Sequence, residues 1–249
     1  MGIIVCVVGL GSAGYRELDR QWNEMLLSEV TWSSPALQLG ASSPAMIATQ
    51  QRDTAGRLAP TDPTRALATA RAIEDPWFAC QALAWVARFA PEDQFISIIK
   101  ESLRVCRAEV DSYRVVAPAA WPIRAIVERN HLKMLPEVIP DLLLRAEDIE
   151  IPASRSEALF LLFQAVFPAG RVNWFPVLKS LRQASTPLIS WRQRRNLCDA
   201  ILIVWGEDKP LAQEIVSELD DVKLKKKVEK LLATSEPVVP RAFFWTTTA

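Results

Sequence analysis

The sequence predicts an all-α fold, a right-handed α-α superhelix of about four helix pairs. Three observations lead to this expectation. Apolar residues recur with helical spacing almost continuously from residue 61 onward. Signals for helix starts come at regular intervals along the same stretch. Finally, the chain has 8 glycines against 9 tryptophans, and so few glycines leave few of the tight turns that an all-β fold needs. A closed bundle of the same helix pairs is the alternative shape.

The stretch 94–110 illustrates the helical period. Its apolar side is formed by Phe95, Ile98, Ile99, Ser102, Leu103, Cys106 and Val110, and its polar side by Lys100, Arg104 and Arg107. We expect further helices to start at Asp62-Pro63, Asp75-Pro76 and Thr186-Pro187, because each pairs a capping oxygen with a proline that fits the first helical turn. Ser154 and Glu157 have the spacing of a capping box ahead of another apolar run.

These starts divide the chain into four similar units, residues 75–110, 111–149, 150–185 and 186–222. Each unit contains a helix, a short break rich in polar residues, proline or glycine, and a second helix. Trp85 matches Trp121 and Leu159 matches Leu197, so the period is about 38 residues, the length of paired-helix repeats. One helix pair cannot bury its own apolar face, whereas stacked pairs share a continuous core.

With its proline-kinked, aromatic-rich first helices, exemplified by Pro118 and Pro122, the stretch 75–222 resembles the HEAT-like and armadillo-type α-solenoid repeats. The resemblance is one of architecture, since the tetratricopeptide signature is missing and the HEAT pattern of Asp and Arg is patchy. It implies a protein whose work is to bind other proteins. We therefore divide the chain into an N-terminal segment and linker (1–60, with one weak helix in 33–60), a helical-repeat domain (61–233) and a C-terminal tail (234–249).

Large aromatic residues are expected to pack between the layers of this array, where each can bury about 150–250 Å². They are Trp77, Trp85, Trp121, Phe160, Phe163, Trp174, Phe175, Trp191 and Trp205. In the tail, Phe243-Phe244-Trp245 would either cover the last helix pair or form an exposed docking motif.

The charge balance excludes a strong electrostatic attraction to nucleic acid or membrane, since 29 basic residues match 29 acidic ones. Charge is polarised along the chain: residues 1–170 carry 16 basic and 20 acidic residues, a net of −4, and residues 171–230 carry 12 and 8, a net of +4. The four cysteines, Cys6, Cys80, Cys106 and Cys198, have no paired spacing. We interpret them as buried thiols of a cytoplasmic protein, although a secreted form with a cleaved leader is an alternative.

The N-terminus contains a glycine pattern, Gly9, Gly11 and Gly14, directly after the apolar run Ile3–Val8. Such a pattern binds dinucleotides when it lies within a parallel sheet and a second strand ends in an acidic residue. Here no acidic residue follows VTW at 30–32, and no further strand pattern appears. We expect a terminal segment that caps the array or stays unstructured, and we keep a nucleotide-dependent enzyme as an alternative.

Other patterns of catalysis are missing, so we expect no enzyme and no cofactor. His131, the one histidine, lacks a partner at metal-ligand spacing and is expected at a helix cap or in a solvated turn. The acidic pairs Glu92-Asp93, Glu147-Asp148, Glu207-Asp208 and Asp220-Asp221 are interpreted as solvated surface. HEAT-like DNA glycosylases share the helical layout, but no tryptophan here is followed by aspartate as in their catalytic cluster, which leaves a DNA-binding or repair protein as a second alternative.

We predict a non-catalytic scaffold that binds a partner on the concave face lined by the second helices. The residues opposite their apolar stripes form a ladder of partner-binding cations: Lys100, Arg104, Arg107, Lys133, Arg145, Lys179 and Arg182. Glu137 and Asp141 interrupt this ladder. Guanidinium groups suit carboxylates, so the expected ligand is an acidic peptide or protein segment, with no membrane partner and no unbroken basic track for DNA.

Overall fold

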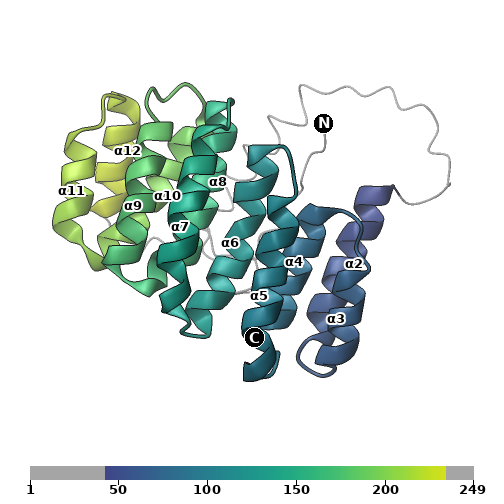
Figure 1. Ribbon diagram of the computed structural model, residues 1–249. Coiled ribbons are helices and arrows are strands. Elements are labelled where there is room, and N and C mark those ends of the chain that lie inside the picture. The colour runs from purple at the N-terminus through teal and green to yellow at the C-terminus, as the bar shows by residue number, and fades with distance from the viewer. Residues whose placement is uncertain (1–42, 234–249) are drawn as a thin grey trace. The chain divides into compact units, whose positions relative to one another are not determined.

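The computed structural model describes residues 43–233 (Figure 1). Within that range the chain forms eleven α-helices, two 3-10 helices and no strand. The α-helices are α2 (Pro44–Leu58), α3 (Pro63–Arg71), α4 (Pro76–Ala87), α5 (Glu92–Arg107), α6 (Ser112–Glu128), α7 (Leu135–Glu147), α8 (Pro152–Val166), α9 (Arg171–Ala184), α10 (Trp191–Glu207), α11 (Lys209–Ser217) and α12 (Val222–Leu232). The 3-10 helices are η1 (Leu132–Met134) and η2 (Phe167–Ala169).

Several predicted features lie outside the described residues. They are the apolar run Ile3–Val8, the glycines Gly9, Gly11 and Gly14, Cys6, and the tail residues Phe243-Phe244-Trp245.

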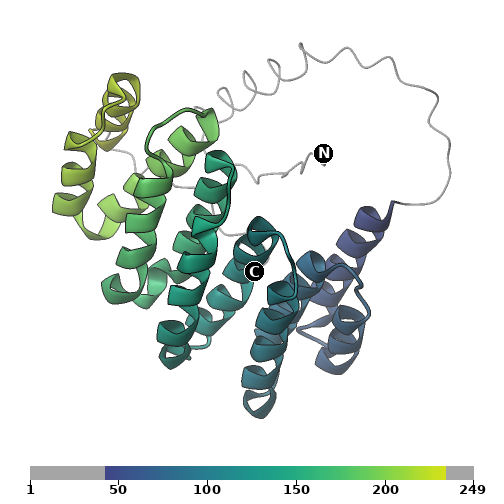
Figure 2. The same cartoon turned by 45° about the horizontal axis from the view of Figure 1, so that its top comes forward.

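Each predicted unit contributes a first helix and a second helix, and the first helices pack on one another in chain order. Thus α4 contacts α2 and α6, α6 contacts α8, and α8 contacts α10. The second helices α5, α7, α9 and α11 each pack on the first helix that precedes them (Figures 1 and 2). As a result, α6 is covered by helices on several sides, and its buried residues run almost without interruption from Val115 to Ile126, including Pro118 and Pro122 within the helix.

Helix starts follow the predicted capping chemistry at two of the three Asp/Thr-Pro sites. The Asp62 carboxylate accepts a hydrogen bond from the Arg65 backbone N–H at 3.0 Å, and Asp75 accepts one from Trp77 at 2.9 Å. At the third site the prediction is wrong, because α10 begins at Trp191. There Ser190 and Gln193 satisfy each other's backbone N–H groups in a capping box, so the helix starts after this pair.

The capping box predicted at Ser154 and Glu157 is also wrong. α8 begins at Pro152 after Ile151, with no side-chain cap. Because proline at the first position already fits the helical φ and needs no partner for an N–H, the helix starts three residues earlier than the capping box predicts, and Ser154 lies inside its first turn.

The stretch expected as a linker with one weak helix contains α2, which packs on α3 and α4. Its buried residues are Ala48, Ala55 and Gly56, all too small to give an obvious apolar stripe. Gly56 contacts the neighbouring helix closely: a Cβ atom placed on it would lie 2.8–2.9 Å from ring atoms of Trp85. Small residues on α2 thus admit a large aromatic ring from α4.

The aromatic core is smaller than the sequence predicts. Trp121, Phe160, Phe163 and Trp174 are buried, with Phe163 and Trp174 in edge-to-face contact at 6.1 Å between ring centroids. By contrast, Phe175 is 38% exposed and Trp191 is 45% exposed. These two rings lie under guanidinium groups, Arg171 over Phe175 at 5.5 Å and Arg195 over Trp191 at 4.9 Å. Trp77, Trp85 and Trp205 are half-buried.

Candidate interaction surface on the second helices

The predicted amphipathic pattern of 94–110 is confirmed in α5, with one exception. Phe95, Ile98, Ile99, Ser102, Leu103 and Cys106 are buried, and Lys100, Arg104 and Arg107 are exposed. Val110 is the exception. It lies beyond the end of α5 and is 90% exposed, because the helical period no longer places it over the core.

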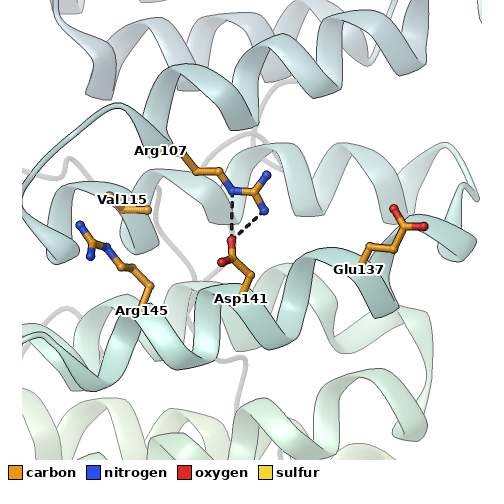
Figure 3. Close-up of a pocket in the computed structure, with 5 residues that line it drawn as sticks. All are labelled: Arg107, Val115, Glu137, Asp141 and Arg145. Atoms are coloured by element: carbon orange, nitrogen blue, oxygen red, sulfur yellow. Dashed lines mark hydrogen bonds and ion pairs between the residues drawn. The ribbon is translucent and has the colours of Figure 1, made fainter.

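The seven predicted cations are distributed over α5, η1, α7 and α9. Arg107, near the end of α5, reaches α7 and donates two hydrogen bonds, from Nε at 3.0 Å and Nη2 at 2.8 Å, to one carboxylate oxygen of Asp141 (Figure 3). Arg145 on α7 donates to the Val110 carbonyl at 3.1 Å. Arg182 on α9 pairs with Glu218, just after α11. These three arginines therefore connect neighbouring units.

Lys100, Arg104, Lys133 and Lys179 differ from those three arginines. All four are exposed, and none forms a hydrogen bond or ion pair with residues 43–233. Glu137 is likewise exposed and without an ion pair in the described chain. It lines a hollow between α5 and α7 together with Arg107, Val115, Asp141 and Arg145 (Figure 3). The ladder is thus divided into four exposed cations without an acceptor among residues 43–233 and three arginines that already have acceptors.

Arginines that link successive units extend well beyond the predicted ladder, and these links were not predicted from the sequence. Arg114 pairs with Asp75, Arg129 with Glu92, and Arg88 with Glu128. The partners are 37–40 residues apart in sequence. Arg171 and Asp208 repeat the arrangement 37 residues apart. Arg/acid pairs separated by about one repeat length are the signal that could have indicated these contacts.

His131 lies at one of these links, and it occupies the N-cap position of η1, the helix end where it was predicted. Its side chain makes no cap hydrogen bond to η1. The ring stacks on Phe95 at 4.4 Å between centroids, and Nε2 lies 2.7 Å from a carboxylate oxygen of Glu92. The Arg129 guanidinium, with a smaller contribution from His131, holds the pKa of Glu92 below its usual range. This cluster joins the ends of α4 and α6 to the start of α5.

The described cysteines are buried thiols, as predicted. Cys80 and Cys106 are fully buried and Cys198 is 4% exposed. Burial raises the pKa of Cys80, and it raises the pKa of Cys198 to about 11. Such thiols are poor nucleophiles. Among residues 43–233 no group of three or more His, Cys, Asp or Glu side chains could hold a metal ion.

Besides Glu92, residues of two further acidic pairs have structural roles beyond that of solvated surface. Asp208 caps α11 and pairs with Arg171, and Asp221 caps α12 and pairs with Arg194. The Arg194 guanidinium, together with backbone N–H groups of α12, lowers the pKa of Asp221. No helix in the described part of the chain is long and apolar enough to cross a membrane.

Comparisons with known proteins give no relative from which a role could be transferred: no family model, curated protein or solved structure matches this chain.

Proposed function

We propose that this protein is a non-catalytic scaffold in the cytoplasm, and that the cationic surface of its second helices binds an acidic peptide or protein segment. The observation that carries the proposal is the set of four exposed cations, Lys100, Arg104, Lys133 and Lys179, outside any ion pair with residues 43–233. Long basic side chains that are not already neutralised are available to carboxylates of a partner.

The ties between units support an ordered rather than diffuse surface. Each second helix follows a first helix that runs the opposite way, so α5 and α7 run parallel. The Arg107–Asp141 pair, 34 residues apart, sets their register. Lys100 and Lys133 are 33 residues apart and therefore lie at nearly the same height on adjacent units. An extended acidic segment crossing the second helices would meet one cation after another.

We further propose that the described helices form a repeat array of the HEAT-like kind, a right-handed superhelix with a period of about 38 residues. The spacing of the arginine links, 34–40 residues between partners, supports that period. In such arrays each layer contacts only its neighbours, and an extended surface suited to elongated partners results. The free thiols of Cys80, Cys106 and Cys198 are compatible with a reducing compartment.

A binding experiment with charge reversals tests the proposal. The variant Lys100→Glu/Arg104→Glu/Lys179→Glu removes three exposed cations without breaking an ion pair seen in residues 43–233. The matched control Arg57→Glu/Arg65→Glu/Lys209→Glu changes the net charge equally at other exposed positions. A fluorescent peptide rich in Asp and Glu serves as the probe in an anisotropy titration, and an uncharged peptide of equal length serves as its control.

We expect wild type and the control variant to bind the acidic peptide similarly, more weakly as salt is raised, and the ladder variant to lose at least about tenfold in affinity, equal to ~1.4 kcal/mol. Equal binding by the ladder and control variants would show that the ladder is not the site. Pull-downs with the same three proteins extend the test to natural partners.

A further inference from the structure

A second exposed surface lies where α5 passes to α6 and α7 passes to α8. It carries three aliphatic side chains that are open to solvent, Val110 (90% exposed), Leu144 (67%) and Ile151 (62%). Exposed carboxylates surround them: Asp111, Glu147, Asp148 and Glu150. We call this set of seven residues the turn patch. Neighbouring apolar residues exposed together are a common mark of an interaction site.

Arg145 links the two turns, and Arg155 stabilises the second of them. Arg145 donates to the Val110 carbonyl at 3.1 Å, and Arg155 donates to the carbonyls of Glu147 and Ile149 at 2.8 and 2.9 Å. These guanidinium groups are directed at backbone oxygens, and only Arg145 approaches a patch carboxylate, Asp148, at 3.5 Å. Glu147 and Glu150 form no ion pair within the described chain. The turn patch is therefore fixed in shape and retains negative charge.

The opposite combination occurs on α12. Leu224 and Val228 are buried against the neighbouring helices, while Lys223, Lys226, Lys227 and Lys230 are exposed on the other side. Val222, the first residue of the helix, is 61% exposed. Thus α12 presents an aliphatic side chain and four ammonium groups over a length of about 16 Å. This complements the aliphatic and acidic character of the turn patch.

We propose that the turn patch of one copy of this chain binds the lysine face of α12 from a second copy. The polarised charge of the sequence, −4 over residues 1–170 and +4 over 171–230, favours such a head-to-tail contact. The two surfaces differ, so the contact is heterologous and leaves one patch and one α12 unoccupied in each pair. Further copies add at these ends, in short open chains or a closed ring. The contact uses none of the four exposed cations Lys100, Arg104, Lys133 and Lys179 that carry the proposed function.

A charge-swap experiment on the full-length protein tests this contact. Variant A is Glu147→Lys/Asp148→Lys/Glu150→Lys, and variant B is Lys223→Glu/Lys226→Glu/Lys230→Glu. Sedimentation velocity measures the association of wild type, A, B and an equimolar mixture of A and B at low ionic strength. It is repeated at about 1 M salt, where the Debye length falls to ~3 Å. The control variant Asp93→Lys/Glu207→Lys/Glu214→Lys changes three exposed carboxylates elsewhere.

We expect wild type and the control to associate with rising concentration at low salt and to dissociate at high salt. A alone and B alone are expected to stay monomeric, since each then has two surfaces of like charge. Mixing A with B restores association, because the basic patch of A meets the acidic α12 of B, and the acidic patch of B meets the basic α12 of A.

Four results would overturn the proposal. Wild type that stays monomeric at low salt would show that the turn patch and α12 do not bind each other. Association by A or B alone would place the contact on another surface. Loss of association in the control would trace any effect to net charge rather than to these two faces, and failure of the A and B mixture to associate would show that the two faces do not bind each other. Far-UV circular dichroism of each variant verifies that it folds, so that a missing contact is not confused with unfolding.

Discussion

The contact between Gly56 on α2 and Trp85 on α4 gives a stability prediction with its own internal control. A Cβ atom on residue 56 would lie 2.8 Å from Cδ2 and 2.9 Å from Cε2 and Cε3 of the indole. Ordinary carbon contacts are about 3.5–4.0 Å, so Gly56→Ala forces the ring or the helix to move by roughly 0.7–1 Å. The ring cannot move without disturbing Trp121, whose centroid lies 5.6 Å from it.

Two opposing effects set the magnitude. Overpacking of this kind costs about 1–3 kcal/mol, while alanine favours the helix over glycine by about 0.8–1 kcal/mol. The net expectation for Gly56→Ala is a loss of about 0–2 kcal/mol. Gly206→Ala in α10 is the matched control, because a Cβ there meets nothing within 4 Å. It should gain up to about 1 kcal/mol, so the two variants should differ by about 1–3 kcal/mol.

Urea unfolding followed by far-UV circular dichroism measures both variants. A double-mutant cycle with Trp85→Leu identifies the cause: with the smaller side chain, Gly56→Ala should lose most of its cost, since the clash is then relieved. If Gly56→Ala and Gly206→Ala unfold at the same urea concentration, α2 does not pack on α4 through the close contact between Gly56 and Trp85.

Four further predictions concern the core, the links, the thiols and ligands. Leu159→Ala should lower the free energy of unfolding by about 2–5 kcal/mol, because the side chain is 1% exposed; an unchanged unfolding midpoint would contradict its place in the core. Glu92 should titrate below the ordinary value of about 4.3 in an NMR pH series. Since the folded pKa of Glu92 is lowered, its contribution to stability is present above the unfolded pKa and is lost as pH falls through the folded pKa. Arg129→Met should raise the pKa of Glu92 in the same NMR titration, and an unchanged pKa would show that the guanidinium is not the cause. In a Cys6→Ser variant, the Cys198 thiol, with its pKa of about 11, should be alkylated at pH 8 more than about 100-fold more slowly in the native than in the unfolded protein. Equal alkylation rates would mean that the thiol is accessible in the native protein. Thermal shift with NAD, FAD, ATP and duplex DNA should leave the melting temperature unchanged, whereas a clear rise with any of them would favour an enzyme or a DNA-binding protein over a scaffold.

Features that depend on neighbours within a few residues were predictable from the sequence alone. The apolar stripe from Phe95 to Cys106 follows the helical period, which is a property of the local chain, and the same stripe faces the core in α5. Asp62 and Asp75 cap the helices that follow them because the acceptor and the N–H groups are two or three residues apart. The start of α10 also depends on nearby residues. The helix begins after Ser190 rather than after Thr186, because the side chains of Ser190 and Gln193 bond to each other's backbone N–H groups.

Which cations are available to a partner depends on contacts between helices and could not be predicted from the sequence. Arg104 and Arg107 lie one helical turn apart and look equivalent in sequence, yet Arg107 meets Asp141 from a helix 34 residues away while Arg104 remains exposed. The packing of α2 was equally hidden, since its contact with Trp85 is made by Gly56, which has no side chain to reveal a pattern. The physical reason is common to both cases. The register between stacked helices depends on how side chains of adjacent units fill space together, and a single helix's period carries no information about that partner.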